Sequence, residues 1–186
     1  MINAIPEKPL PDIIAPNLSI LFVGYNPGLY SAAAGHHYAG KSNRFWKLLH
    51  ESGLLPILLK PEEDHQLLKY GYGSTNIVPR PTKSAAEISA EEFTAGSKEL
   101  ANLIRDYTPS IVCYVGFGVY RAFVSNLLGI PHSKIKIVPG AQSHRLFESS
   151  TDYICSNPSG LNTIPYEVQL ECFRNLNALK ACSSIP

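Results

Sequence analysis

In two places in the sequence, an apolar run is followed by a similar polar turn. Residues 21–28 are LFVGYNPG and residues 153–160 are YICSNPSG, so Asn26 and Asn157 each stand between an apolar run and a proline. Proline lacks an N–H and holds the residue before it extended, while glycine allows the backbone to approach a ligand closely. A carboxamide held in this way can orient water or contact a polar heterocycle, although Asn-Pro-Gly is also an ordinary turn sequence.

The segment after the first turn contains aromatic and imidazole groups between two glycines. Residues 35–40 are GHHYAG, and residues 42–46, SNRFW, then open a helix. The amides and dipole at a helix start favour an anion. An aromatic ring facing Asn26 across a small pocket suits a flat heterocycle, because base–aromatic stacking is worth about 1–3 kcal/mol. Metal ligation and a surface loop are the alternatives for His36 and His37, and without a third ligand at a recognisable spacing no metal site is predicted. Phe45 and Trp46 fit the core better than a ligand contact.

Strand-like and helix-like segments alternate along the rest of the chain, which is typical of a mostly parallel sheet covered on both faces. We therefore expect a three-layer α/β/α domain, with ligands bound beyond the carboxyl ends of the strands. Residues 1–17 contain four prolines and are predicted to be an extended lead-in to a single domain at 18–186. The expected strands are 18–23, 75–78, 111–115, 135–138 and 152–156. The expected helices run from 42 or 43 to 53, over 61–71, from 89 to before Pro109, over 119–128 and over 166–180.

Composition narrows the class of protein. The chain has 186 residues, 45% of them apolar, which fits one globular domain and argues against disorder. No apolar run is long enough to span a membrane and the N-terminus has no signal pattern, so a soluble intracellular protein is expected. The net charge of +1 excludes a molecule-wide basic field but permits a local basic face. The four cysteines lack paired spacing, and Cys113 and Cys155 are expected to be buried free thiols.

The stretch VGYNPGLYSAAAGHHYAGKSNRFWKLL at 23–49 resembles the first motif of the mismatch-specific uracil/thymine DNA glycosylases, a branch of the uracil-DNA glycosylase superfamily. LPDIIAPNLSILFVGYNPGL, YGYGSTNIVPRPT, EEFTAGSKELANLIRDYTPSIVCYVG and NPSGL follow the same order, so that the resemblance covers nearly the whole chain. It implies a uracil-DNA glycosylase-like fold and a monofunctional glycosylase that starts base excision repair. Such an enzyme removes uracil, and thymine or damaged pyrimidines, from mispaired double-stranded DNA.

The resemblance also assigns roles to residues. Asn26 matches the asparagine that holds the attacking water, and the residues expected to bind the flipped base are Gly24, Tyr25, His37, Tyr38, Asn43 and Asn76. For Asn43, a helix N-cap is an equally good assignment. The second turn matches the loop that enters the duplex and fills the gap left by base flipping, with Leu161 as its apolar plug; its residues are Asn157, Ser159, Gly160, Leu161 and Asn162. We expect no cofactor, a monomer, and a location in the nucleus, or in the cytoplasm of a bacterium.

Some positions depart from the pattern, and other functions remain open. Thr163 stands where bacterial members carry an arginine that reads the widowed guanine. Ser31 resembles the bacterial uracil enzymes, whereas His37 and Tyr38 resemble the thymine-removing vertebrate branch. The cations available for phosphate contacts are Lys41, Arg44, Lys47, Arg80 and Lys83.

Two alternative functions are a mismatch-binding module without catalysis and a small-nucleotide hydrolase. The hydrolase needs a phosphate loop, of which residues 116–118, GFG, supply only a fragment. No lysine occupies the water-holding position, so Schiff-base chemistry is not expected.

Overall fold

The computed structural model describes residues 9–183, so the first eight residues of the predicted lead-in and the last three residues of the chain lie outside the described part. Its strands are β1 (Ile20–Gly24), β2 (Tyr72–Asn76), β3 (Ile111–Val115), β4 (Gly140–Ala141) and β5 (Thr151–Cys155). Its α-helices are α1 (Leu29–Ala34), α2 (Phe45–Glu51), α3 (Ala90–Tyr107), α4 (Phe117–Leu128) and α5 (Tyr166–Ser183), and 3-10 helices cover η1 (Pro61–Tyr70), η2 (Ala85–Glu87) and η3 (His132–Lys134).

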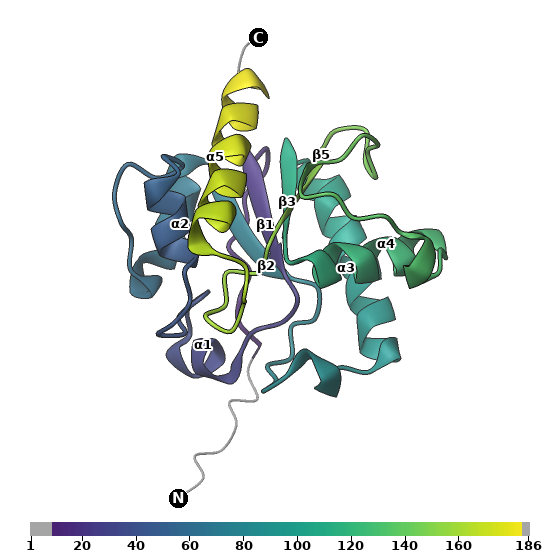
Figure 1. The fold of residues 1–186 in the computed structure, drawn as a ribbon. Coiled ribbons are helices and arrows are strands. Elements are labelled where there is room, and N and C mark those ends of the chain that lie inside the picture. The colour runs from purple at the N-terminus through teal and green to yellow at the C-terminus, as the bar shows by residue number, and fades with distance from the viewer. Residues whose placement is uncertain (1–8, 184–186) are drawn as a thin grey trace, which may run out of the picture.

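The five strands form one sheet in the order β2-β1-β3-β5-β4, with all pairs parallel except β4 with β5. Helices cover both faces, with α2 and α5 on one side and α3 and α4 on the other (Figure 1). Side chains of β1 alternate between the two faces, since Phe22 packs with α2 and α5 whereas Leu21 and Val23 pack with α3 and α4. The predicted three-layer fold with a mostly parallel sheet is confirmed.

Strands β1, β3 and β5 match the predicted runs closely because each is buried on both faces. The predicted strand at 135–138 is wrong. Ile135 and Ile137 pack against the α3–α4 core without joining the sheet, and the next strand, β4, comes only at Gly140–Ala141. The helix expected from Ser42 or Asn43 begins at Phe45, and the short helix α1 was not anticipated.

The sheet topology creates a crevice above β1. The chain passes from β1 to β2 on one side and then to β3 on the other, and ligands bind at such switch points beyond the carboxyl ends of the strands. Residues 10–13 of the lead-in close this region from the β2 side, since Leu10 and Ile13 are buried and Ile13 exchanges two backbone hydrogen bonds with Ser74. Within residues 9–183, no helix has the length and apolarity needed to cross a membrane.

Candidate active site

A cleft of about 840 Å³ opens at the carboxyl ends of β1, β3 and β5. The two predicted turns, at 24–28 after β1 and at 156–161 after β5, both line it, because parallel strands end at the same edge of the sheet. We call them the first and second exit loops. Of the predicted site residues, the cleft brings together Gly24, Tyr25, Asn26, His37, Tyr38, Asn43, Asn76, Asn157, Ser159, Leu161 and Asn162. Gly160 does not line it and instead packs on the neighbouring loop.

Asn26 has a carboxamide whose two ends differ in their surroundings. Its Nδ2 donates to Oγ1 of Thr82 at 2.7 Å and lies 3.2 Å from the carbonyl oxygens of Pro27 and Arg80. Thr82 is buried and donates its own proton to the carbonyl of Ser84, so its oxygen is left to accept from Asn26. The Oδ1 atom of Asn26 accepts no hydrogen bond from another described residue. This arrangement fixes the amide and leaves an acceptor at the cleft.

The loop at 80–84 supplies two of these acceptors. From the sequence, its Arg80 and Lys83 are expected only as phosphate contacts, and its hydrogen bonds to Asn26 are not predicted. Ser84 with Glu87 and Ser89 with Glu92 form two successive capping boxes. The guanidinium of Arg80 forms a two-pronged contact with Glu92 and donates to the carbonyl of Glu87 at 2.9 Å. Thr82 stands in a proline-rich stretch without periodicity, where pattern reasoning gives no signal for its role.

Tyr38 lies across the cleft from Asn26 in an uncommon backbone conformation. Its φ is 53°, in the left-handed region that a bulky side chain rarely adopts, and such outliers gather at functional sites. The buried ring of Phe45 stacks on one face of the Tyr38 ring, with the ring centroids 3.6 Å apart and an interplanar angle of 19°. Phe45 does not line the cleft, so it backs the ring from behind. Burial raises the pKa of the Tyr38 phenol, and its hydroxyl has no partner among the described residues.

His37 is buried, with both ring nitrogens engaged. Its Nε2 lies 2.9 Å from the carbonyl of Pro11, and its Nδ1 lies 3.1 Å from Oγ of Ser74. A carbonyl can only accept, so Nε2 carries the proton and Nδ1 accepts from Ser74. Burial is the main cause that lowers the pKa of His37, which favours this neutral form. The ring therefore links the loop at 35–40 to the N-terminal segment and to β2, and it also lines the cleft.

Asn43 and Asn76 both line the cleft. Asn43 accepts from the N–H of Phe45 at 2.9 Å, but the N-cap position of α2 is Arg44, so Asn43 is not the N-cap. No described residue hydrogen-bonds to the side-chain amide of Asn76, which lies over Gly24. A Cβ at position 24 would come within 2.5 Å of Oδ1 of Asn76, so glycine is what makes room for this amide. The ring of Tyr25 packs against Phe93 of α3, with the two ring centroids 4.4 Å apart.

The second exit loop is tightly folded and carries one projecting side chain. Asn157 accepts from the N–H of Ser159, and Ser159 accepts from the N–H of Leu161. The loop rests on the first one, because Arg44 N–H donates to the carbonyl of Pro158 at 2.9 Å and Gly160 packs against Ser42. Leu161 is 92% exposed, although burying an apolar side chain of its size is favourable.

The start of α4 is a further part of the cleft. Gly116, Phe117 and Gly118 line it, and nothing lies within 4 Å of the position that a Cβ of Gly118 would occupy. The adjacent Ser156 is buried, and its hydroxyl has no partner among the described residues. Free amides at the first turn of a helix accept an anion readily. In the sequence, GFG at residues 116–118 after a strand is only a weak signal for this place.

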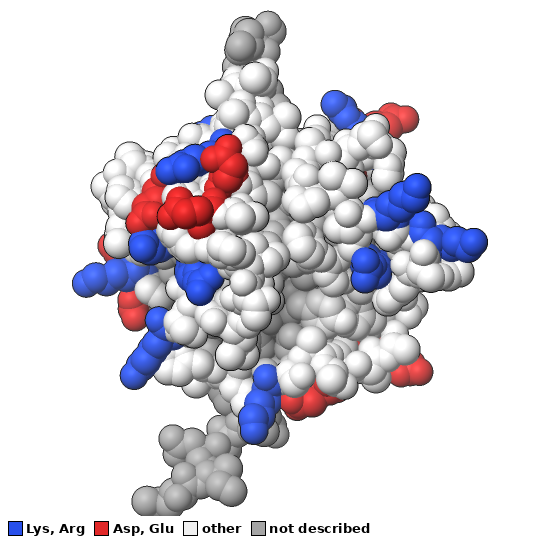
Figure 2. All heavy atoms as spheres, viewed as in Figure 1, with Lys and Arg blue, Asp and Glu red and all other residues white. Residues whose placement is uncertain are grey.

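Figure 2 shows a hollow near the middle of the drawn face, with Lys and Arg side chains on both sides of it. Lys41 and Lys83 are exposed, and Lys83 lines the cleft. Two of the other predicted phosphate ligands are engaged within the protein, Arg80 with Glu92 and Lys47 with Glu51 at 3.5 Å. The third, Arg44, has its Nη1 buried without a partner among the described residues. No group of three or more His, Cys, Asp or Glu side chains in residues 9–183 is arranged to hold a metal ion.

Comparison with known proteins adds two findings. Residues 11–179 match the family model described as the Uracil DNA glycosylase superfamily. The fold is similar to that of a Methanosarcina acetivorans protein, solved in solution and described as a candidate uracil DNA glycosylase. That match has a TM-score of 0.58 at 17% sequence identity and covers 92% of this chain and 98% of the other. At such low identity the second match supports the fold, whereas the family model covers most of the chain.

Proposed function

Because the chain belongs to the uracil DNA glycosylase superfamily, we propose that it hydrolyses the N-glycosidic bond of uracil in mispaired double-stranded DNA. Thymine or a damaged pyrimidine opposite guanine is a further proposed substrate. The reaction leaves an abasic site and so initiates base excision repair. The polar, aromatic cleft at the sheet edge is the proposed place for the everted nucleotide.

One observation carries the proposal: the Nδ2 of the Asn26 carboxamide is held by hydrogen bonds, whereas its Oδ1 has no partner among the described residues. With Nδ2 committed to Thr82 and to two carbonyls, Oδ1 is the group left to accept a hydrogen bond from a water molecule. An amide is a poor general base, so it orients the water without deprotonating it strongly. A pure mismatch-binding module would have no use for such a group.

The proposed chemistry depends on departure of the base. The C1′–N1 bond breaks with its electron pair going to the pyrimidine, and the sugar becomes oxocarbenium-like. The water held by Asn26 then adds to C1′ and loses a proton to solvent. Tyr38, backed by Phe45, would stack on the everted base, and the unpaired amide of Asn76 would contact its polar edge. Because the water is only weakly activated, pyrimidines that are good leaving groups should react fastest.

The exposed Leu161 is the proposed wedge. A glycosidic bond inside a duplex is out of reach, and extruding a nucleotide costs a few kcal/mol, least at a mismatch. A leucine held at the tip of a folded loop can fill the space in the stack. The first turn of α4 with Ser156, and the cations Lys41 and Lys83, are the proposed contacts to phosphate groups, which the unpartnered Ser156 hydroxyl and the exposure of both lysines support.

An assay on defined duplexes tests the function. A duplex with a single G·U pair is incubated with the protein and then treated with alkali, which cuts the strand at abasic sites. Cleavage at that position supports the glycosylase. Intact but gel-shifted DNA would support the mismatch-binding module, and release of uracil from free deoxyuridine alone would support a nucleotide hydrolase.

Variants at two sites separate chemistry from binding. Asn26→Ala should abolish base release while DNA binding stays within about twofold, because the residue orients water and contributes little to phosphate binding. Loss of binding and release together would mean that Asn26 is structural. Leu161→Ala should slow release more from well-paired than from mispaired duplexes without lowering the melting temperature, since Leu161 is exposed.

A further inference from the structure

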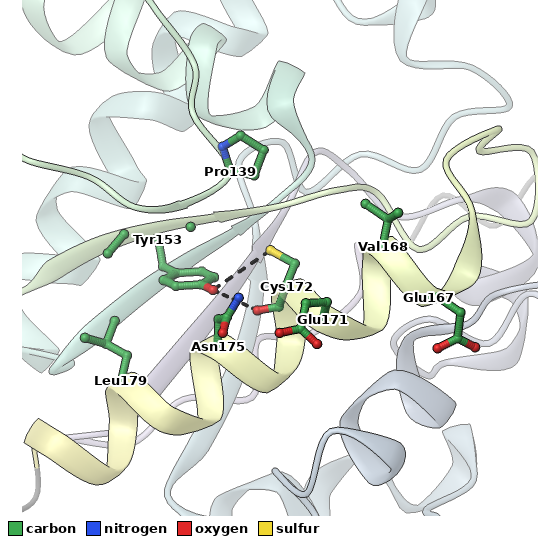
Figure 3. A pocket seen from close by; sticks show the side chains of 10 residues that line it. Pro139, Tyr153, Glu167, Val168, Glu171, Cys172, Asn175 and Leu179 are labelled. Carbon is green, nitrogen blue, oxygen red and sulfur yellow. Dashed lines mark hydrogen bonds between the residues drawn. The ribbon is translucent and has the colours of Figure 1, made fainter.

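A second hollow, separate from the cleft, lies between α5 and the strands β4 and β5. It has a volume of about 730 Å³. Figure 3 shows its lining side chains, with Tyr153 at the floor and a row of α5 residues along one wall. The lining residues are Pro139, Gly140, Ala141, Tyr153, Glu167, Val168, Glu171, Cys172, Asn175 and Leu179. None of these residues lines the proposed base-binding cleft.

The hollow exists because the sheet ends in a very short strand. β4 has two residues and pairs only with Tyr153 and Ile154, and both of its residues are small. Tyr153 lies at the bottom of the hollow but is itself only 2% exposed, so the accessible apolar surface comes mainly from lining residues such as Pro139, Val168 and Leu179. The Tyr153 hydroxyl is satisfied internally, since it donates to the carbonyl of Cys172 at 2.7 Å. An occupant would therefore meet mainly apolar surface in the hollow.

Exposed apolar side chains stand in the hollow and next to it. The lining residue Val168 on α5 is 59% exposed, and Val138, which precedes the lining residue Pro139, is 62% exposed. A hollow bordered by further apolar surface is typical of a protein interface, where one buried anchor side chain contributes much of the binding energy. An enclosed small-molecule pocket would instead cover most of its ligand.

The rim of the hollow is acidic. Glu167 and Glu171 stand one turn apart on α5, where like charges repel. Glu171 lies 3.6 Å from Arg174, whereas Glu167 forms no ion pair with another described residue. This charge opposes a DNA backbone and favours a cationic partner.

We propose that this groove docks an amphipathic segment of a partner protein, with an apolar anchor over Tyr153 and Lys or Arg side chains against Glu167 and Glu171. The partner is a basic protein segment rather than DNA. Because the groove and the cleft share no lining residue, the segment binds while DNA occupies the cleft. The proposal does not depend on which pyrimidine the cleft accepts.

Three synthetic peptides test the pairing of apolar and basic character. The first is a helix-forming peptide of about 12 residues, or three turns, with leucines on one face and lysines beside them. The second replaces its lysines by glutamates, and the third replaces its leucines by serines. Binding is followed by amide chemical shifts of the full chain. Cys172 lines the groove, and the exposed Cys182 serves as an internal reference.

The first peptide should shift the amides of Ala141, Cys172 and Asn175, with the amide of Cys182 unchanged. The second and third peptides should not shift them. Glu167→Lys with Glu171→Lys should reverse the preference toward the glutamate peptide. Val168→Asp should weaken binding of the first peptide, and base release from a G·U duplex should be the same for all these variants as for the parent chain.

Three results would overturn the proposal. One is the absence of shifts at the groove with any peptide, and another is equal binding of the lysine and glutamate peptides. The third is a set of shifts that maps to the cleft around Asn26. All three substituted side chains are exposed, so a folding failure is not expected, and a thermal unfolding curve of each variant checks this.

Discussion

At the scale of single residues, the chemistry proposed for Asn26 depends on its neighbour Thr82. The Thr82 hydroxyl accepts the shortest of the three contacts of the Asn26 amide, at 2.7 Å. Thr82→Val keeps the shape and removes the acceptor. A hydrogen bond is worth about 1–1.5 kcal/mol net, so the single-turnover rate of uracil release should fall about five- to tenfold.

The DNA affinity of Thr82→Val should stay unchanged in a titration, and Thr82→Ser, which keeps the hydroxyl, should restore most of the rate. An unchanged rate in the valine variant would show that the Thr82 contact does not hold the amide in its working orientation.

His37 gives a prediction about protonation. Burial lowers its pKa, so the folded protein binds fewer protons at this ring than the unfolded chain, whose histidine has its ordinary pKa near 6.5. The stability that depends on the neutral ring is therefore complete above about pH 6.5 and is lost as the pH falls below that value. Ring NMR signals should show His37 protonated on Nε2 at neutral pH and titrating below 6.5. Titration at or above 6.5 would contradict the assigned hydrogen bonds.

The residues of the site divide by how much the sequence reveals of them. Asn26 and Asn157 could be predicted because proline and glycine mark the end of a buried strand. Leu161 followed from resemblance alone, since its position has no local signal. Tyr38 had a local signal in the aromatic and imidazole groups between two glycines, and the resemblance assigned its role. Thr82 and Ser156 were missed because their roles come from contacts with segments more than 50 and about 40 residues away: Thr82 meets Asn26, and Ser156 adjoins the α4 start.

At the scale of elements, the two exit loops act as one unit. A Cβ at Gly160 would come within 2.4 Å of the Cβ of Ser42 and 2.8 Å of its backbone carbonyl oxygen. Gly160→Ala should therefore lower the melting temperature and slow uracil release by displacing Leu161. Adding Ser42→Gly removes the side-chain part of the clash and should recover part of both losses. If the two substitutions have additive effects in a double-mutant cycle, the loops do not support each other.

Elements buried on both faces were the most predictable. β1 and β3 are continuous apolar runs, and β5 has one at Tyr153–Cys155. β2 is buried too but has the sequence YGSTN, and the strand predicted at 75–78 overlaps it only at Thr75 and Asn76. The alternation Lys134–Ile135–Lys136–Ile137 also fits a strand, but packing of the two isoleucines against the α4 side satisfies the same pattern without sheet pairing. The alternation of apolar and charged residues indicates which face of the segment is buried. It does not indicate whether the backbone pairs with a neighbouring strand.

At the scale of the whole molecule, a net charge of +1 means that DNA affinity must come from a few local cations. Each phosphate neutralised by a cation adds about 0.9 to the slope of log affinity against log salt concentration. Lys83 is exposed at the cleft, so Lys83→Gln should lower that slope by about 0.9. Arg80 is held by Glu92 and supports the loop that binds Asn26, so Arg80→Gln should leave the slope unchanged and reduce the rate of base release. Fluorescence titrations of a G·U duplex at several salt concentrations, with single-turnover rates on the same duplex, measure both quantities. An equal fall in slope for both variants would show that Arg80 leaves Glu92 to bind a phosphate.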